Sequence, residues 1–368
     1  MPQPCIVACG ALTALGNLDE IWQNLCDVRT GLQPLHIVGL EQQYPVGIIA
    51  DLKGQIGTSA RLIDLISRGF FSVPDLAEIA CLADCIVTTT KGAADELLDP
   101  SSVPWKGQPW QLGDMVAEFL HCQGKIQVVS AACASGTIGL IQAAIQVEDE
   151  SSEVVIVIGI DILSRFVIAG FASLQALSPD PCRPFDRSRN GLSLGEGMGL
   201  MVVTSEKLAV RKGWPILAKI AGCGVACDAT HITAPCRKGS GLHRVFFEAT
   251  KENRIQVGGV NAHGTGTFYN DAMEITAIRS FWKTDSPPIH SVKGAIGHCL
   301  GAAGVIEAAI AVLSLHKEQI PPTVGLKQPE IEILPISGAK LLPLSCPSIL
   351  SCNAGFGGIN AGILFNRE

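Results

Sequence analysis

The run VVIVIGI at residues 154–160 constrains the fold of this chain more than any other segment. Six of its seven residues are β-branched, which favours a strand, and the run is far shorter than the roughly twenty apolar residues of a membrane-spanning helix. A strand with apolar residues at successive positions is buried on both faces, as in sheets covered by helices. Similar short runs predict strands at residues 5–9, 199–204, 216–221 and 361–365.

These strands alternate with helical patterns, which indicates an α/β protein whose mostly parallel sheets are covered by helices. The 368 residues are 47% hydrophobic and 17% charged, enough to fill one large domain or two closely packed halves. The chain has no low-complexity segment and no long linker. We expect two halves of similar plan, residues 1–210 and 211–368.

Composition also argues against several classes of protein. A net charge of −7 and the lack of a Lys/Arg run argue against nucleic-acid binding. We expect no membrane span and no secretory signal, and therefore a cytoplasmic protein. The fourteen cysteines lie mostly in apolar contexts, which favours buried free thiols over disulfides, and their spacing completes no zinc site.

Cys133 lies in a segment that predicts a strand, a tight turn of small residues and a buried helix starting at or just after the cysteine. A thiol at a helix N-terminus is near the positive end of the helix dipole, so we expect its pKa to be lowered. A cysteine that merely packs between strand and helix explains this segment equally well.

Two later segments carry imidazoles and an ammonium in glycine-rich surroundings. His263 lies in the segment NAHGTGT (261–267), and Lys293 and His298 flank the turn KGAIGH (293–298). Glycines let the backbone approach a ligand closely, although a lone histidine there is more often a turn residue. Glu307 is the one acid in the apolar helix that follows, and it is expected to pair with Lys293 because either charge alone is costly to bury. That pair alone could be purely stabilising.

Taken together, these segments resemble the β-ketoacyl-acyl-carrier-protein synthases, in particular the elongating, decarboxylating branch. Further motifs of this family are PFD at 184–186, GEGMG at 195–199 and CNAGFGG at 352–358. The motifs follow in family order from residue 5 to residue 365. The resemblance implies a thiolase-like αβαβα sandwich of two related halves, a dimer, and an active site between the halves.

The resemblance also implies a role for each matching residue. Cys133 is the acyl-accepting nucleophile, His263 and His298 are the paired histidines, and Lys293 pairs with Glu307. The backbone N–H groups of Cys133 and Phe356 form an oxyanion hole, and the Phe356 side chain gates the site. The threonines that contact phosphopantetheine are Thr233, Thr265 and Thr267.

The implied reaction is a decarboxylative Claisen condensation of an acyl-enzyme thioester with malonyl-acyl-carrier-protein, giving a β-ketoacyl product in fatty-acid, polyketide or polyene synthesis. The reaction requires no metal or redox cofactor. Phosphopantetheine is part of the carrier-protein substrate. Lys293 is expected to orient and polarise the histidines and not to act as a general base. We expect a homodimer, or a heterodimer with a related subunit, because so little charge implies a hidden apolar face.

Neighbouring branches of the superfamily differ at single residues. Degradative thiolases use a second cysteine near the C-terminus, and Cys352 lies in that region. Initiating synthases have Asn where His298 stands, and non-catalytic chain-length factors lack the residue that Cys133 provides. A thiolase-type acyltransferase, a ketosynthase subunit paired with a chain-length-factor-like partner and a purely scaffolding protein remain the alternatives.

The chain departs from the family in two places. It is short around residues 88–123, where the family builds part of its dimer cap and acyl pocket, and Ala354 replaces the first phenylalanine of the usual FGFGG turn. Both changes bear on which acyl chain fits. Basic residues for an acidic carrier are sparse, and the candidates are Arg61, Arg68, Arg211 and Lys212.

Overall fold

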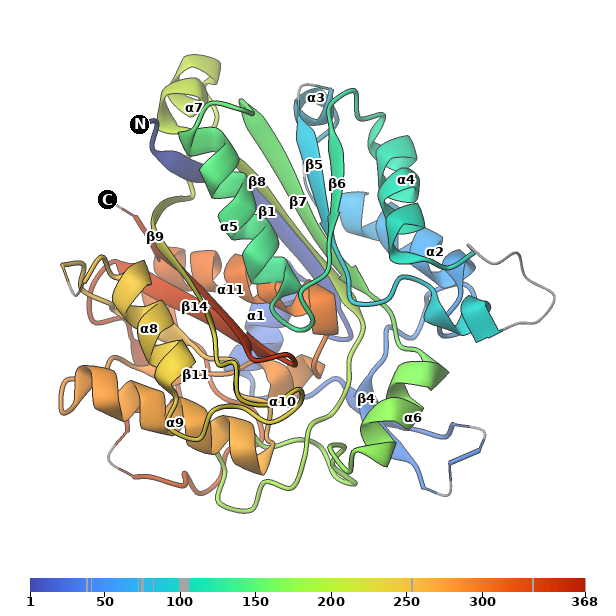
Figure 1. The fold of residues 1–368 in the computed structure, drawn as a ribbon, viewed down its shortest axis with the longest axis vertical. Helices are drawn as coiled ribbons and strands as arrows, with labels where there is room; N and C mark the ends of the chain where they lie inside the picture. The colour runs from blue at the N-terminus through green and yellow to red at the C-terminus, as the bar shows by residue number, and fades with distance from the viewer. Residues whose placement is uncertain are drawn as a thin grey trace.

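The computed structural model describes residues 1–37, 39–40, 42–71, 73, 76–81, 83–98, 106–252, 254–332 and 334–367. Its strands form one large sheet that is continuous across both halves of the chain, and Figure 1 shows how the helices surround it. The strand order is β11-β10-β14-β15-β9-β1-β8-β7-β5-β6.

The first part of this sheet comes from residues before 206. Its strands are β1 (Pro4–Thr13), β5 (Asp84–Thr88), β6 (Ile126–Val129), β7 (Val154–Asp161) and β8 (Gly197–Ser205), with β2 (Gly16–Asn17) paired to β1. The predicted strand at 154–160 lies within β7, which is buried at every position, as expected. The predicted strands at 5–9 and 199–204 lie within β1 and β8.

The second part comes from residues after 217. Its strands are β9 (Ala218–Cys227), β10 (Val260–Asn261), β11 (Ile289–His290), β14 (Ser348–Gly355) and β15 (Ile359–Asn366). It joins the first part where Cys5 and Ile6 of β1 pair with Lys219 and Ala218 of β9. Two small two-stranded sheets lie apart from the large sheet. They are β3 (Leu32–Leu35) with β4 (Tyr44–Gly47), and β12 (Gln319–Ile320) with β13 (Leu342–Pro343).

The prediction of mostly parallel sheets is wrong. Only β5 with β6 and β7, and β10 with β11 and β14, pair in parallel within the large sheet, and all its other described pairings are antiparallel. The β14–β15 pair is one example. Its two strands run antiparallel because a tight turn of residues 356–358 joins them, with Gly357 and Gly358 at positive φ.

Two buried helices lie between the two parts of the sheet. They are α5 (Ser135–Glu148) and α11 (Ala303–Lys317), which begins after the 3₁₀ turn η2 (Leu300–Ala302). Leu140 of α5 and Val312 of α11 share one apolar cluster with Val155 of β7 and Ile363 of β15. The segment Leu300–Lys317 is long and apolar enough to cross a membrane, but it is 83% buried, so it is a core helix.

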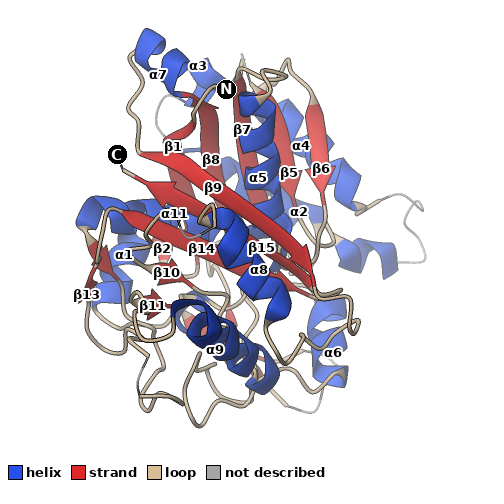
Figure 2. Ribbon diagram, turned by 60° about the vertical axis from the view of Figure 1, so that its left-hand side comes forward, coloured by secondary structure: helices blue, strands red, loops and turns tan. Residues whose placement is uncertain are grey.

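Outer helices cover both faces and complete the expected αβαβα order of layers. On the first part, α4 (Pro109–Leu120) packs on β5 and β6, and α2 (Ser59–Phe71) packs beside it on β1 and β8 (Figure 1). On the second part, α8 (Ser240–Ala249) covers β9 and β15, with α9 (Phe268–Trp282) beside it (Figure 2). The remaining helices are α1 (Leu18–Cys26), α3 (Leu76–Ala80), η1 (Ala94–Leu98), α6 (Arg165–Ser173), α7 (Glu206–Lys212) and α10 (Lys293–Ile296).

The contact between α5 and α11 depends on glycine. A Cβ on Gly136 of α5 would lie 2.7 Å from the backbone nitrogen of Val305, and one on Gly304 of α11 would lie 2.4 Å from the backbone nitrogen of Thr137. Cβ atoms essentially never approach backbone this closely, so the two helices touch backbone to backbone. This contact fixes the ends of both helices that carry the site described below.

Candidate active site

A cavity of about 400 Å³ lies where the two halves meet. It brings together eight of the residues predicted from the sequence. These are Cys133, Thr233, His263, Thr265, Thr267, His298, Ala354 and Phe356. Lys293 and Glu307 lie directly behind this lining, almost completely buried.

Cys133 is placed by the strand, turn and helix that its segment predicts. β6 ends at Val129, Ala132 adopts φ +49° in the turn, and α5 begins at Ser135. The Ser135 hydroxyl stabilises the turn by donating to the Ala132 carbonyl at 2.5 Å and accepting from the Ala131 N–H at 2.8 Å. The thiol therefore lies at the N-terminal end of α5 and faces the cavity.

The expected lowering of the Cys133 pKa is wrong. Burial raises the pKa of this thiol to about 12, and the nearby Lys293 ammonium and the Phe356 N–H, which donates to the sulfur, only partly oppose it. Desolvation of a thiolate in an apolar cavity outweighs the helix dipole here. The resting Cys133 side chain is a neutral thiol.

His263 is fixed through both its backbone and its ring. Its N–H and that of Gly264 each donate at 2.7 Å to the carboxylate of Glu274 on α9. Its ring Nδ1 lies 3.1 Å from Nδ2 of Asn353 on β14. Burial, helped by the charge of Lys293, lowers the pKa of His263 well below its usual value. The imidazole is therefore neutral.

His298 faces His263 across the cavity, with the two rings 5.1 Å apart and nearly perpendicular. Neither nitrogen of the His298 ring has a hydrogen-bond partner among the described residues, although both are buried. Burial and Lys293 lower its pKa well below the usual value, so this ring is also neutral. Two buried, unpartnered ring nitrogens that face a cavity are free to bind a ligand oxygen.

Lys293 and Glu307 form the predicted pair, with Nζ 2.5 Å from Oε1. The pair does more than neutralise two charges, because Nζ also donates to the carbonyl of His263 at 2.6 Å. Glu307 Oε2 accepts from Asn353 at 2.7 Å. The buried pair thus ties α10 and α11 to the loop of His263.

The three predicted threonines lie on two loops of the cavity wall. Thr265 and Thr267 hydroxyls are 2.9 Å apart, and Asp271 accepts the Thr265 N–H at 3.0 Å. The loop of Thr233 is shaped by His231, whose Nδ1 accepts the Thr233 N–H at 3.1 Å. All three threonines line the cavity on the way to Cys133.

Phe356 and Ala354 lie where β14 enters the hairpin turn. The Phe356 ring stacks on Phe171 of α6 with centroids 5.5 Å apart and planes 20° apart. Ala354 is half-buried and also lines the cavity. Cys352, two residues earlier, is buried in the apolar cluster under α8, away from the cavity lining, and burial raises its pKa well above the usual value. Cys352 is therefore not placed to act as the second cysteine of a thiolase-type site.

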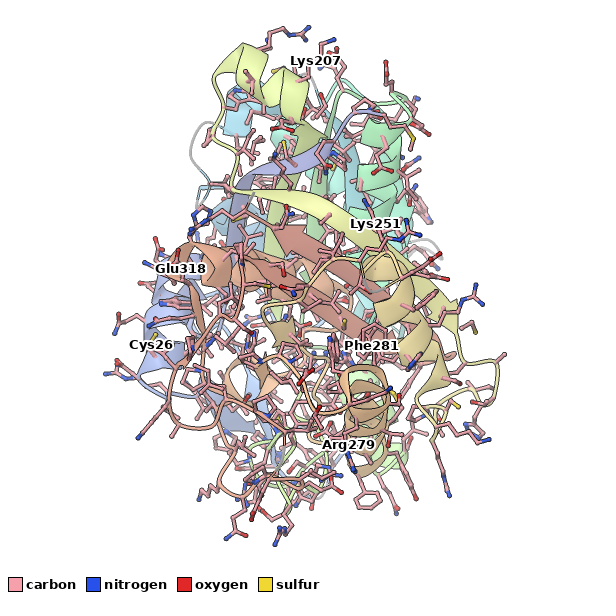
Figure 3. All side chains as sticks on the ribbon, turned by 90° about the vertical axis from the view of Figure 1, so that its left-hand side faces the viewer. Cys26, Lys207, Lys251, Arg279, Phe281 and Glu318 are labelled. Atoms are coloured by element: carbon pink, nitrogen blue, oxygen red, sulfur yellow. The ribbon has the colours of Figure 1, made fainter. Side chains whose placement is uncertain are left out.

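The proposed docking residues do not lie at the cavity. Arg61 is buried in an ion pair with Glu196, so its candidacy is wrong. Arg68 pairs with Asp64 on α2. Arg211 and Lys212 belong to α7, and Figure 3 shows Lys207 of that helix at the opposite end of the molecule from α9, whose first residues line the cavity.

The segment around residues 88–123, which the sequence marks as short, runs from the end of β5 through η1 to α4 and the turn after it. Residues 99–105 lie outside the described part of the chain. The segment's part in an acyl pocket or dimer cap stays a prediction.

Sequence reasoning missed three residues that hold the histidine loop: Asp271, Glu274 and Asn353. Asp271 and Glu274 are three residues apart on α9, so both face the loop of His263, and such an i, i+3 acid pair after a glycine-rich loop was a detectable signal. Asn353 lies in the motif CNAGFGG (352–358), but the motif alone predicts no role for it. Its contacts come from distant segments and could not be read from its neighbours.

Two family profiles match this chain. The profile "Beta-ketoacyl synthase, N-terminal domain" matches residues 85–209, and "Beta-ketoacyl synthase, C-terminal domain" matches residues 217–327. The chain belongs to the beta-ketoacyl synthase family. The resemblance inferred from the motifs is confirmed, and so is the thiolase-like fold.

Curated members of the family are similar along different shares of the chain. Nodulation protein E of Rhizobium meliloti is 35% identical over 61% of this chain, and the match spans 57% of that protein's length. The 3-oxoacyl-[acyl-carrier-protein] synthase 2 of Synechocystis is 28% identical over 98% of this chain and 97% of its own.

Among solved structures, two are similar over the full length of this chain at 25% identity. A ketosynthase in complex with its chain length factor, from Xenorhabdus doucetiae, has a TM-score of 0.85 and is covered over 98% of its length. A beta-ketoacyl synthase from Burkholderia phymatum has a TM-score of 0.87 and is covered over 100%.

Proposed function

We propose that this family member condenses an acyl group held on Cys133 with malonyl-acyl-carrier-protein, with loss of CO₂. The observation that carries the proposal is the cavity in which one buried thiol faces two neutral imidazoles. A general acid–base site would keep a titrating histidine, whereas two neutral rings offer N–H donors to a developing oxyanion.

In the first half-reaction the Cys133 sulfur attacks the acyl thioester of a carrier protein. The acyl–sulfur bond of the carrier breaks, a new thioester forms on Cys133, and the thiol proton leaves with the carrier sulfur. The Phe356 N–H already points at Cys133 and, with the Cys133 N–H, would hold the tetrahedral oxyanion. One such donor is worth about 10²–10³ in rate.

In the second half-reaction malonyl-carrier loses CO₂ and negative charge develops on its thioester oxygen. His263 and His298 N–H donors would stabilise this enolate, and their effect is large because the buried cavity screens charge poorly. The enolate carbon then attacks the Cys133 thioester, which releases the thiolate and gives a β-ketoacyl-carrier two carbons longer. The thiolate regains a proton from solvent.

Lys293 acts through position and charge in this scheme. Its ammonium is already committed to Glu307 and to the His263 carbonyl, which leaves it unsuited to take protons. It keeps the His263 loop in place and helps to keep both imidazoles neutral. Glu307 balances its buried charge.

Thr233, Thr265 and Thr267 line the way to Cys133 and offer hydroxyls to a phosphopantetheine arm that the carrier brings. No metal ion or redox cofactor has a step in this scheme. We keep the cytoplasm as the proposed location, and residues 1–210 and 211–368 as the proposed halves.

A dimer is also part of the proposal, and a related subunit is a specific candidate partner. Among the described strands of the large sheet, β6 is an edge strand that pairs on one side only, next to Cys133 in sequence. An unpaired edge invites pairing with another chain. Two similar solved structures are ketosynthases with a chain length factor. Light scattering of the chain alone and with a co-expressed relative distinguishes homodimer from heterodimer.

The decisive experiment is mass spectrometry of carrier-bound products after the purified protein is incubated with acyl-carrier and malonyl-carrier. A product two carbons longer with a β-keto group supports the proposal, and its absence in Cys133→Ala assigns it to this site. Transfer between acyl-CoA species with no CO₂ release would favour the thiolase-type alternative, and acyl binding without turnover would favour a scaffold.

A further inference from the structure

A buried ion pair at the carboxyl ends of β5 and β7 has no part in the scheme above. Nζ of Lys91 lies 2.8 Å from Oδ1 of Asp161, and both side chains are almost completely removed from solvent. Burying two charges costs desolvation that their attraction rarely more than offsets. The Lys91–Asp161 pair is therefore better explained by the backbone segment that it keeps in place than by a gain in stability.

Asp161 holds a segment of the active site. Its Oδ2 accepts the Gly301 N–H at 2.7 Å, and the Thr88 hydroxyl donates to the Gly301 carbonyl at 2.9 Å. Thr89 and Thr90 hydroxyls also donate to Asp161, at 2.8 and 2.9 Å. Gly301 is thus anchored on both sides to the ends of the first part of the sheet.

Leu300, one of the two residues between His298 and this anchor, has a strained backbone. Leu300 adopts φ +51°, a conformation that a leucine keeps only when its surroundings enforce it. His298 lies two residues earlier, and its own backbone is held by Ser193 and Gly195. Leu300 also packs in the same apolar cluster as Cys133. The path of the chain past His298 therefore depends on the anchor at Gly301.

We propose that Asp161, paired with Lys91, is a positioning residue for His298. Through Gly301 it enforces the left-handed backbone of Leu300, and this keeps the unpartnered imidazole aimed into the cavity. Asp161 touches no reacting atom. The inference rests on the proposed function, since it assigns Asp161 to the half-reaction that uses His298.

The test compares two half-reactions in matched variants. Asp161→Asn replaces one acceptor oxygen by a donor. Asp84→Asn makes the same change at the other end of β5, where Asp84 accepts the Lys125 N–H. We expect Asp161→Asn to slow CO₂ release from malonyl-carrier about tenfold, with Cys133 acylation changed less than about threefold. Asp84→Asn should leave the ratio of the two rates unchanged.

A second comparison separates positioning from general damage. Glycine adopts a positive φ without help from its surroundings. Asp161→Asn should therefore reduce the rate of CO₂ release by a smaller factor in Leu300→Gly than in wild type. If Asp161→Asn does not fold, Thr88→Val tests the same anchor from the carbonyl side and should shift the ratio in the same direction.

The outcomes distinguish the two ideas. A wild-type protein that neither accepts acyl groups nor releases CO₂ refutes the proposed function. A wild type that does both, with Asp161→Asn or Thr88→Val changing both rates equally or neither, overturns the positioning role. An equal loss from Asp161→Asn with and without Leu300→Gly also overturns it.

Discussion

Nδ2 of Asn353 lies 3.1 Å from Nδ1 of His263, and this contact decides which ring nitrogen carries the proton. The orientation of the amide is set, because Oδ1 accepts the Thr137 hydroxyl at 2.5 Å and Nδ2 also donates to Glu307. Nδ1 of the neutral ring must then accept, which leaves the proton on Nε2. The amide thereby prepares His263 as a hydrogen-bond donor.

Replacing Asn353 by Ala is therefore expected to slow CO₂ release from malonyl-carrier by about 10- to 100-fold, the usual cost of losing a group that orients a functional histidine. Thr137→Val removes only the hydroxyl that orients the amide and should give a smaller loss in the same half-reaction. The measurement is CO₂ release with Cys133 acylation followed in parallel. Wild-type decarboxylation by Asn353→Ala would show that the assigned tautomer does not matter.

Cys133 should be the sole acylation site. Intact mass after incubation with an acyl thioester should show one adduct in wild type and in Cys352→Ala, and none in Cys133→Ala. Access excludes Cys352, which is buried in the cluster under α8, while Cys133 faces the cavity. The exposed Cys81 and Cys227 lie outside the cavity lining that would bind the acyl thioester. An adduct that persists in Cys133→Ala would restore the thiolase-type alternative.

His290 should make the protein sensitive to acid. It is buried on β11 with neither ring nitrogen hydrogen-bonded to a described residue, and burial lowers its pKa from 6.5 to about 3. Between these values the unfolded chain binds a proton that the native state excludes, so stability is lost as pH falls from about 6.5 towards 3. The loss between pH 7 and pH 5 should be about 2 kcal/mol.

His290→Leu should remove the share of this dependence that comes from His290, because its imidazole is gone while those of His263 and His298 remain. Urea unfolding at both pH values measures it, with His316→Leu as the control for loss of an exposed ring. If wild type and His290→Leu lose the same free energy of unfolding between pH 7 and pH 5, the buried ring is not responsible.

Ala354→Phe should narrow the range of acyl chains that the protein accepts. The added ring would enter the cavity lining beside Phe356, which already stacks on Phe171. We expect a shift towards short or flexible chains on a panel of acyl-carrier primers, with CO₂ release from malonyl-carrier largely kept. Phe171→Ala should widen the range, since it frees one face of Phe356. An unchanged profile in both variants would exclude this wall as a determinant of chain choice.

Carrier docking should depend on two cations beside the cavity, Arg237 and Lys238, which we call the rim, and not on α7. The Arg237 guanidinium lies 5.8 Å from the ring centre of Tyr269, which lines the cavity, and Lys238 is exposed beside it. Arg237→Glu with Lys238→Glu should raise KM for acyl-carrier and leave KM for an acyl-pantetheine unchanged, because only the carrier protein is acidic and large enough to reach the rim. Arg211→Glu on α7 is the matched control, and an equal effect there would place the docking surface elsewhere.

Sequence patterns predicted burial in this fold better than strand direction. The apolar runs of β7 and β8 predict buried strands, and both strands are buried. They nevertheless pair antiparallel. Covering by helices on both sides makes a strand apolar whichever way it runs, so composition carries no information about direction.

At the active site, the sequence located the reactive side chains but not their environment. The turn before α5 placed Cys133 at a helix start, yet the burial that raises its pKa comes from residues far along the chain, such as Ile168, Leu192 and Leu300. Arg61 looked like a free surface cation because its partner, Glu196, is 135 residues away. The role of Asn353 depended in the same way on Thr137, 216 residues away.

The glycine contact between α5 and α11 bears on how such chains diverge. Cys133 precedes α5 and Glu307, the acidic partner of Lys293, lies on α11, and these two mostly buried helices touch through Gly136 and Gly304. A side chain at either glycine would push the two backbones apart and move Cys133 relative to Glu307, so divergence has to spare these two positions. A quarter of identical residues is then enough to preserve the whole architecture, as the TM-score of 0.87 to the Burkholderia synthase illustrates.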